Sequence, residues 1–375
     1  MATRSLSLAA STWPSAACHQ PPHRQQSQTL LVWREPVPGS SSNNTCVVPL
    51  GWTWEQRAPL AGQQFVEATE GLAPFDQLTV GVGDSACDDH DLAIAVQHPR
   101  CRARVIPDYI FSAWPSVGLA SFDATARELA ALGAKSQAST NVCGWAGTTR
   151  TSPARIAAVA VMRQHPRLFA LHEVKPLKVA DPSRRFSWES QVREWSCLVD
   201  LVGGGYSGRV PLLLHTGRPL LYIERTVRTF YDTPPHAIQP WKHYVPVRAD
   251  LHDLVAKAQW VVDNPAEARR IGLKGQEHAQ RYLTRPAAIA AMRGRFLEAL
   301  QRRRESPPSL EGPSLPPLAP IEPKQPVRPR QPLAVQPRPP SRTSGDPCAA
   351  ARTLDSRRKC RARQTAVEIS IHKRN

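Results

Sequence analysis

The strand-like and helical patterns of this chain predict an α/β fold, and three observations support that prediction. Two apolar runs, Cys197–Val202 and Leu220–Glu224, have the length and composition of strands. A glycine-rich turn lies between them. Upstream, Ile156, Val159 and Ala160 recur at the spacing of one helix face.

The two ends of the chain lack the pattern of a folded core. Residues 1–60 are rich in Ser, Pro, Gln and Thr, and residues 305–375 are rich in Pro and Arg. Neither segment has the periodicity that buries apolar side chains, so both are expected to be disordered or poorly structured. The folded part is then about 240 residues long, enough for two small lobes.

The first part of the folded region shows few apolar runs that indicate strands. Within residues 61–104, Leu78–Val82 and Leu92–Val96 are the strand candidates. The sequence ATARELAALG at residues 124–133 predicts a helix, and Asp123, directly before it, is expected to cap that helix.

The turn between the two later strands offers donors for an anion. It ends in Gly205-Tyr206-Ser207-Gly208-Arg209. Glycines let backbone N–H groups approach a ligand closely, and arginine adds a planar fork of donors that suits phosphate. The turn therefore predicts a phosphorylated ligand. The alternative is that the glycines serve only tight packing between strand and helix.

The same turn formally matches a dinucleotide-binding fingerprint. Gly203, Gly205 and Gly208 have the G-x-G-x-x-G spacing, and Glu224 lies where a ribose-binding acid is expected. However, Pro211 falls where the crossover helix should be running, and few residues remain before the next strand. A nicotinamide-binding fold is therefore the weaker interpretation.

A second candidate for phosphate binding lies upstream. Ser152 is a good N-cap and Pro153 suits the first helical position, which places Arg155 in the first turn, just after Thr149 and Arg150. A cation is locally unfavourable at the positive end of a helix, whereas an anion binds there readily. Arg155 thus indicates a bound phosphate, and the alternative is a solvated arginine.

The last part of the folded region is expected to support the fold rather than to bind a ligand. Trp241–Arg248 indicates a short buried strand. Asp250 is expected to cap a helix that includes Leu251, and Asn264-Pro265 to open another helix with Glu267 in a capping box.

Three segments in this order resemble glycosyltransferase family 90, which includes CAP10-like capsule proteins, lipopolysaccharide-modifying enzymes and protein O-glucosyltransferases. They are GWAGTTRTSPAR (residues 144–155), residues 186–221 with the glycine-rich turn, and residues 238–284. The resemblance runs from about Arg104 to Tyr282.

The resemblance implies a GT-B-like fold with two Rossmann-like lobes and a UDP-sugar in the cleft. Residues 61–140 would form a small acceptor-side lobe, and residues 141–304 the nucleotide-sugar-binding lobe. The implied nucleotide-sugar contacts are Arg155, Ser207 and Arg209, with Thr149, Arg150, Gly205, Tyr206, Gly208 and Glu224 around them. The UDP-sugar would be the donor substrate, and no cofactor is expected.

The implied activity is transfer of glucose or xylose to a hydroxyl of a cell-surface glycan such as lipopolysaccharide or capsule. The family places an Asp just before an aromatic-Pro pair as the base, but Ser112-Ala113 precede Trp114-Pro115 here. Asp108 and Asp123 flank the motif and are the candidate substitutes. The missing acid leaves open a degenerate relative that binds nucleotide-sugar or glycan without turnover.

The formal net charge of +17 comes largely from the Arg-rich tail. Such a tail suits peripheral contact with an anionic membrane, and the alternative is a disordered tail with no single partner. No specific nucleic acid is expected, because the tail lacks interleaved aromatics and no DNA- or RNA-binding motif is present.

The eight cysteines show no CxxC pair, so no metal site is predicted, and Cys197 is expected to be a small buried hydrophobe. The apolar stretch after Arg4 only faintly resembles a signal or transit peptide. A cytoplasmic location is therefore expected, and peripheral contact with a membrane is compatible with it.

Overall fold

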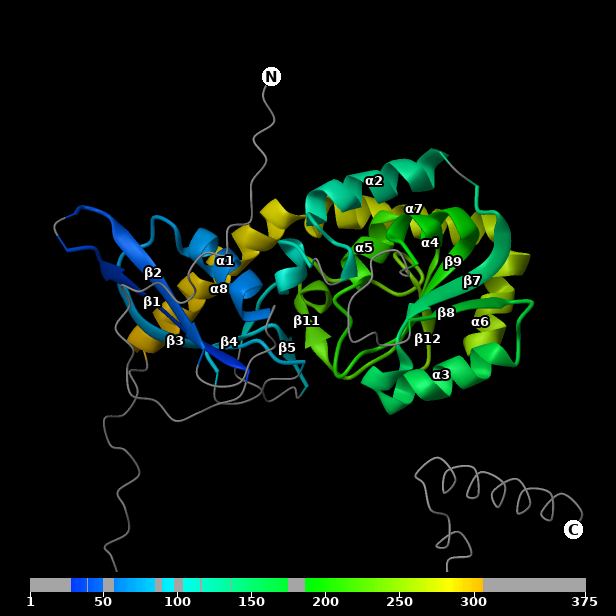
Figure 1. Ribbon diagram of the computed structural model, residues 1–375, viewed down its shortest axis with the longest axis horizontal. Coiled ribbons are helices and arrows are strands. Elements are labelled where there is room, and N and C mark those ends of the chain that lie inside the picture. The colour runs from blue at the N-terminus through cyan, green and yellow to red at the C-terminus, as the bar shows by residue number, and fades with distance from the viewer. Residues whose placement is uncertain are drawn as a thin grey trace, which may run out of the picture. The chain divides into compact units, whose positions relative to one another are not determined.

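The computed structural model describes residues 28–38, 40–49, 57–84, 90–97, 104–114, 117–135, 137–174 and 186–305. These residues lie within one compact unit, Met1–Ser309. Two five-stranded sheets organise it, and we call each sheet with its covering helices a lobe (Figure 1).

The second lobe is a parallel sheet. Its strands are β7 (Thr140–Gly147), β8 (Phe169–Glu173), β9 (Trp195–Asp200), β10 (Leu220–Ile223) and β12 (Val245–Val247). Their order is β12-β10-β9-β7-β8, and every neighbouring pair is parallel. The predicted strands at residues 197–202 and 220–224 are confirmed as the adjacent pair β9 and β10.

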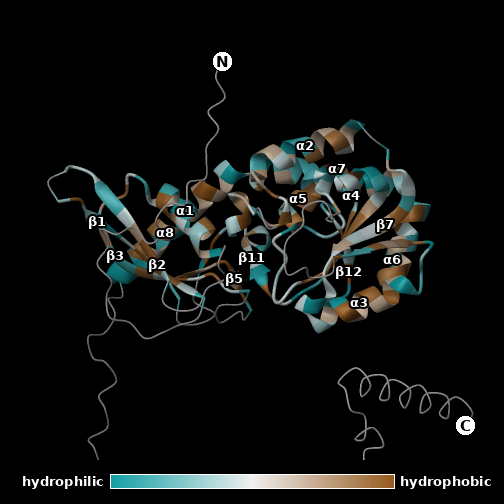
Figure 2. Cartoon of the chain, viewed as in Figure 1, coloured by the Kyte–Doolittle hydropathy of each residue, from teal (hydrophilic) through white to brown (hydrophobic). Residues whose placement is uncertain are grey.

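Helices cover both faces of this sheet (Figure 1). Because successive side chains of a strand point to opposite faces, Leu198 and Leu220 pack with α2, α4 and α5, whereas Val199 and Leu221 pack with α3 and α6. The helices are α2 (Phe122–Lys135), α3 (Pro153–Arg163), α4 (Trp188–Glu194), α5 (Val210–His215), α6 (Leu254–Asp263) and α7 (Pro265–Tyr282). In Figure 2 the helices show both apolar and polar colours, as expected for elements with one face on a core.

The first lobe is a mixed sheet in the order β2-β1-β3-β4-β6. The strands are β1 (Thr29–Pro36), β2 (Asn43–Pro49), β3 (Phe75–Gly81), β4 (Leu92–Ala93) and β6 (Arg104–Val105). Strand β1 is antiparallel to both of its neighbours, whereas β3, β4 and β6 are parallel.

Two helices far apart in the sequence cover this sheet: α1 (Arg57–Thr69) and α8 (Arg285–Glu305). Phe65 of α1 meets Phe296 of α8 edge to face, with ring centroids 5.7 Å apart. A short antiparallel pair, β5 (Ala95–Val96) with β11 (Arg228–Thr229), joins the two lobes.

The expected lobe boundaries differ from the structure in three places. Strands β1 and β2 lie inside residues 1–60, where no core was expected; their alternating apolar side chains are buried on both faces. Helix α2 packs on α4 and α5 of the second lobe, and α8 returns to the first lobe. Composition averaged over the first sixty residues hides the two short strands. Residues 1–27 and 306–375 lie outside the described residues.

The helix predictions are confirmed in part. Ser152 caps α3 as expected, with its side chain accepting from the Arg155 N–H at 3.3 Å, and α7 begins at Pro265. Asp250 does not cap α6, which begins at Leu254, because Leu251 has a left-handed φ of 62° that interrupts the helix. Glu267 forms no capping box and instead pairs with Arg270.

Cys197 is buried, as expected, but it is not a free thiol. It forms a disulfide with Cys143, its partner on the neighbouring strand β7. Cys46 is also disulfide-bonded. Within the described part of the chain, no helix is long and apolar enough to cross a bilayer.

Candidate functional site

The candidate site lies where the strand order of the second lobe reverses. The chain starts at β7, moves outward to β8, and then crosses back to β9, β10 and β12. In open parallel sheets, ligands bind beyond the carboxyl ends of the strands at such a switch point. Here that point is the gap between the ends of β7 and β9.

Arg155 reaches into this gap from the first turn of α3. Its guanidinium donates to the carbonyl oxygens of Thr148, Leu201 and Val202, at 2.9–3.1 Å. The first of these residues follows β7 and the other two follow β9. Burial, together with the nearby Arg209, lowers the pKa of Arg155 to about 10.

Arg209 enters the same gap from the end of the glycine-rich turn. Its Nη1 donates to the Ala146 carbonyl oxygen of β7 at 2.5 Å, and its Nη2 lies 3.6 Å from the Asp200 carboxylate at the end of β9. The two arginines predicted from separate motifs thus converge on one switch point. Burial lowers the pKa of Arg209 as well, and Asp200 opposes that effect.

Asp200, at the end of β9, holds the glycine-rich turn in place. Its carboxylate is fully buried. Oδ1 accepts a hydrogen bond from Ser207 Oγ at 2.6 Å, and Oδ2 forms an ion pair with Arg225 Nη2 at 2.5 Å. Burial would raise the pKa of Asp200, but Arg225 and Arg209 hold it below its usual value. Ser207 therefore fixes the turn rather than presenting a free hydroxyl.

The charges at the switch point do not balance within the described residues. Arg155, Arg209 and Arg225 surround a single buried carboxylate, Asp200. Buried donor atoms without a hydrogen-bond acceptor remain on Arg209 (Nε and Nη2) and on Arg225 (Nη1). Unpaired buried cations are costly unless a ligand supplies the missing charge. The arrangement is suited to an anion such as a diphosphate.

The glycine-rich turn also meets the first lobe. A Cβ added at Gly205 would overlap the Asp84 carbonyl oxygen, and one at Gly204 would lie 2.5 Å from the Asp84 carboxylate. A Cβ at Gly208 would lie 2.6 Å from the Asp108 carboxylate. These glycines permit close approach of the two lobes, so they serve packing, and ligand binding by the turn stays a prediction.

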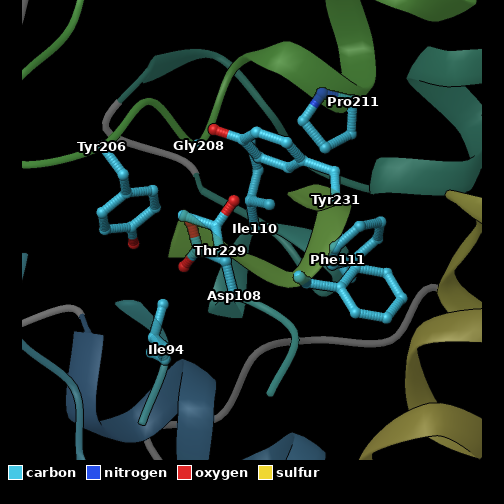
Figure 3. A pocket seen from close by; sticks show the side chains of 10 residues that line it. Ile94, Asp108, Ile110, Phe111, Tyr206, Gly208, Pro211, Thr229 and Tyr231 are labelled. Carbon is cyan, nitrogen blue, oxygen red and sulfur yellow. The ribbon is translucent and has the colours of Figure 1, made fainter. Parts of the chain in front are cut away.

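Tyr206 packs against the first lobe. Its side chain is buried and joins the core of the first lobe with Tyr109 and Ile94. It also lines a cavity of about 10 Å³ with Asp108, Gly208 and the side chain of Thr229 (Figure 3). Tyr206 therefore connects the lobes, and the structure does not place it with Arg155.

Asp108 follows β6 and lies in this small cavity. Both of its carboxylate oxygens are buried, and the Tyr206 hydroxyl and the Tyr109 backbone N–H lie near enough to favour the charged form. Burial raises its pKa to about 6, although Arg57 opposes the effect. A cavity of this size holds about one water molecule.

Asp123 serves a different element. Its carboxylate accepts a hydrogen bond from the backbone N–H of Arg285 at 3.2 Å, so it caps the start of α8 rather than its own helix. The cap of α2 comes instead from Ser121, whose Oγ accepts from the Ala124 N–H. Asp123 lines a separate hollow with His215 and is not brought to the glycine-rich turn.

The remaining predicted residues lie along the same edge of the second sheet. Thr149 and the exposed Arg150 belong to a 3-10 turn, Thr149–Thr151, directly after β7. Glu224 follows β10 and is exposed. The dinucleotide fingerprint lacks its usual context, because α5 has six residues and Pro211 lies in its first turn.

Sequence patterns missed three charged residues of the site. Asp200 is the last residue of β9, and Arg225 lies two residues after β10. The rule that polar groups at the ends of parallel strands gather at one edge would have found them. Asp84 follows β3, so the same rule would have marked it as polar at a strand end, but its contact with the glycine-rich turn required the packing of the two lobes.

The described residues contain no cluster of three or more His, Cys, Asp or Glu side chains arranged to hold a metal ion. Of the polar stretch at residues 87–90, only His90 is described, and its Nε2 lies 2.8 Å from Thr29 Oγ1.

Part of this chain is similar to known proteins. Protein O-glucosyltransferase 2 of Danio rerio is 39% identical over 75 residues, which cover 20% of this chain and 14% of that protein. Protein O-glucosyltransferase 3 of Mus musculus is 38% identical over 81 residues, 22% of this chain and 16% of that protein. The chain thus matches only about a seventh of the length of these relatives.

The family model is the broader match. The model of glycosyl transferase family 90 aligns with residues 98–290, just over half of the chain. This range holds the parallel sheet, both arginines and the glycine-rich turn. By this match the chain belongs to glycosyl transferase family 90.

Proposed function

We propose that this protein transfers a hexose or pentose from a UDP-sugar to an acceptor hydroxyl, with the donor held between two lobes of the GT-B type. Family membership supports glycosyl transfer in general. The observation that supports a nucleoside diphosphate donor is the excess of guanidinium groups at the β7/β9 switch point.

The chemistry of the site follows from these charges. When the bond between the sugar and the diphosphate breaks, negative charge grows on the departing UDP. Arg155 and Arg209 are already held by backbone carbonyls, so they stabilise that charge without reorganising. Asp200, through Ser207 and Arg209, keeps the turn and the arginine in place.

The acceptor is open to two classes in this proposal. The predicted acceptor is a cell-surface glycan, whereas the relatives' names describe glucosylation of proteins. A protein hydroxyl is the acceptor favoured by those names. The predicted contact between the basic tail and a membrane depends on residues outside the described part of the chain.

The disulfide between Cys143 and Cys197 is informative about the cellular compartment of the protein. Disulfides persist in oxidising compartments and are rare in the cytosol. Because Cys143 and Cys197 are bonded, we favour an oxidising compartment over the cytoplasmic location expected from sequence.

The test of the donor is a thermal-shift titration with UDP, UDP-glucose, UDP-xylose and NADH. A ligand that binds the native state raises its melting temperature, by an amount equivalent to about 2.7 kcal/mol at a hundredfold excess over Kd. We expect UDP and at least one UDP-sugar to raise it. A rise with NADH and none with any uridine nucleotide would contradict the proposal.

A binding protein without turnover is the second candidate. It is favoured by Ser112-Ala113 at the position where the family has its acid. It predicts binding of UDP-sugar without UDP release, in the presence of glycans, Ser/Thr-containing proteins or water as acceptor. Acceptor-dependent UDP release by the purified protein would exclude it.

A further inference from the structure

The sequence contains one Asn-x-Ser/Thr motif in which the middle residue is not proline, Asn43-Asn44-Thr45. This motif is the acceptor of N-linked glycans, which are carried on the surface of secreted proteins. The disulfide between β7 and β9 favours an oxidising compartment, and Cys46 on β2 is also disulfide-bonded. The motif therefore belongs to a chain whose cysteines fit the compartment in which the motif is used.

Asn43 lies at the tip of a hairpin. It is the first residue of β2 and pairs with the last residue of β1, Pro36. Asn43 is partly exposed, and the three serines before it, residues 40–42, are exposed. The Asn43 amide makes no hydrogen bond to any part of the chain that the structure describes. A glycan on this nitrogen would therefore displace no contact of the fold.

The hydroxyl of the motif is used by the folded protein. Thr45 is buried. Its Oγ1 accepts a hydrogen bond from Arg34 Nη1 at 2.6 Å and lies 2.8 Å from Thr69 Oγ1, at the end of α1. The whole motif is thus accessible only before the hairpin packs on α1. Glycosylation must then take place on the chain as it enters the compartment, before folding.

The hairpin tip lies at the end of the first sheet that is away from the candidate site. Strands β1 and β3 are antiparallel, with Arg34 opposite Phe75 and Thr29 opposite Gly81. The tip therefore lies beyond the start of β3, whereas the glycine-rich turn meets Asp84, beyond the end of β3. Figure 1 shows β1 and β2 on the side of the first lobe away from the second lobe. A glycan at the tip leaves the candidate site open.

Strand β2 is also an edge of the first sheet. Among the described residues it pairs with β1 alone, and its seven residues, Asn43–Pro49, include no charged side chain. An uncharged edge strand can pair with a strand of another chain, because one row of its N–H and C=O groups is unpaired. A bulky, hydrophilic glycan on the first residue of β2 hinders such pairing.

We propose that Asn43 carries an N-linked glycan and that this glycan protects the β2 edge from pairing with a second copy of the chain. The co-reactant is a lipid-linked oligosaccharide diphosphate. Nδ2 of Asn43 forms a bond to the anomeric carbon of the first sugar, and the amide releases one proton. The bond from that carbon to the diphosphate oxygen breaks, and its electron pair leaves on the diphosphate. This inference rests on the oxidising compartment and does not depend on the UDP-sugar donor.

The test uses the full chain with its own N-terminus, produced in cultured animal cells. Peptide N-glycosidase removes an N-linked glycan and converts the asparagine that carried it to aspartate. We expect the mass of wild type to fall on treatment, and peptide mass spectrometry to find the conversion at Asn43. Asn43→Gln should show no change in mass. Asn44→Gln keeps the motif and is the matched control, so it should keep the glycan.

Sedimentation of the same proteins tests the protective role. We expect Asn43→Gln and the deglycosylated wild type to form dimers or larger species at concentrations at which glycosylated wild type and Asn44→Gln do not. Thr45 is not a suitable position for this test, because its replacement would also remove the contacts with Arg34 and Thr69.

Two outcomes overturn the proposal. An unmodified Asn43 in wild type contradicts the glycosylation site, and equal self-association of Asn43→Gln and glycosylated wild type contradicts the protective role. After the first outcome, a second preparation with an added secretion signal identifies the premise that failed. Modification only behind the added signal, with free thiols at Cys143 and Cys197 without it, shows that the compartment was wrong. No modification behind the added signal shows that the site was wrong.

Discussion

The two lobes differ in how they treat buried charge. The second lobe surrounds one carboxylate, Asp200, with arginines, and each of its oxygens has a partner. The first lobe buries Asp108 without an ion pair to either oxygen, and its nearest polar neighbours are the Tyr206 hydroxyl and the Tyr109 backbone. The pKa values move in opposite directions, down for Asp200 and up for Asp108. The comparison shows that burial alone does not decide the state of a carboxylate; its neighbours do.

The largest effect is expected from Asp200→Asn. Removing the carboxylate leaves Arg225 and Arg209 buried without their counter-charge, which typically costs 3–5 kcal/mol. Urea denaturation at pH 7 measures it. The lowered pKa means that Asp200 stabilises the native state above its unfolded pKa and loses that effect as pH falls below about 4. Stability of the variant equal to wild type at pH 7 would show that Asp200 is not the central acceptor.

Arg209→Ala tests whether the uncompensated cations bind the donor. A charge-assisted hydrogen bond contributes about 1.5–3 kcal/mol, so we expect the Kd for UDP to rise roughly 10- to 100-fold. Arg163→Ala is the control, because this arginine is exposed on the last turn of α3 and pairs with Glu173. Calorimetry with UDP measures both variants. Equal affinities would remove Arg209 from the site.

Asp108→Asn should have the opposite sign to Asp200→Asn. The folded pKa of about 6 lies above the unfolded value, so the protonated form is favoured in the native state. Native stability is then complete below about pH 4 and decreases as pH rises through 6. The amide removes this penalty, and we expect the variant to be more stable than wild type by roughly 2–3 kcal/mol at pH 8 and unchanged at pH 4. Destabilisation at pH 8 would show that the attraction of Arg57 outweighs the cost of burying the carboxylate.

The same contrast explains how much sequence reasoning could predict. The second lobe builds its site within residues 144–225, so Ser152, Arg155 and the glycine-rich turn each carry a local signal. Strands β9 and β10, the cap of α3 and the convergence of two arginines were predictable for that reason. Asp200 could also have been predicted as a site residue, because it lies at the carboxyl end of a parallel strand.

The first lobe offers little such signal. Strands β4 and β6 have two residues each, too few to show alternation, and α8 packs on α1 although some 220 residues separate them. Asp108 was found from its motif, but its enclosure by Tyr206 and Tyr231 required the fold. Asp123 was placed correctly at a helix start, yet it caps α8, which no local pattern reveals.

The smallest expected change in stability concerns the contact between the two lobes. The neighbouring residues Gly204 and Gly205 allow a comparison of two substitutions at this contact. A Cβ at Gly205 meets the backbone carbonyl of Asp84, which cannot move without shifting the end of β3, whereas a Cβ at Gly204 meets the end of the Asp84 side chain. Overpacking against a fixed group typically costs 1–3 kcal/mol. We therefore expect Gly205→Ala to lose about that much stability in urea and to bind UDP more weakly. Gly204→Ala should lose less than 1 kcal/mol, because a side chain can rotate away. If the two variants lose equal stability, the lobes do not meet at the Asp84 backbone, and Asp84 would then be free to move relative to the donor.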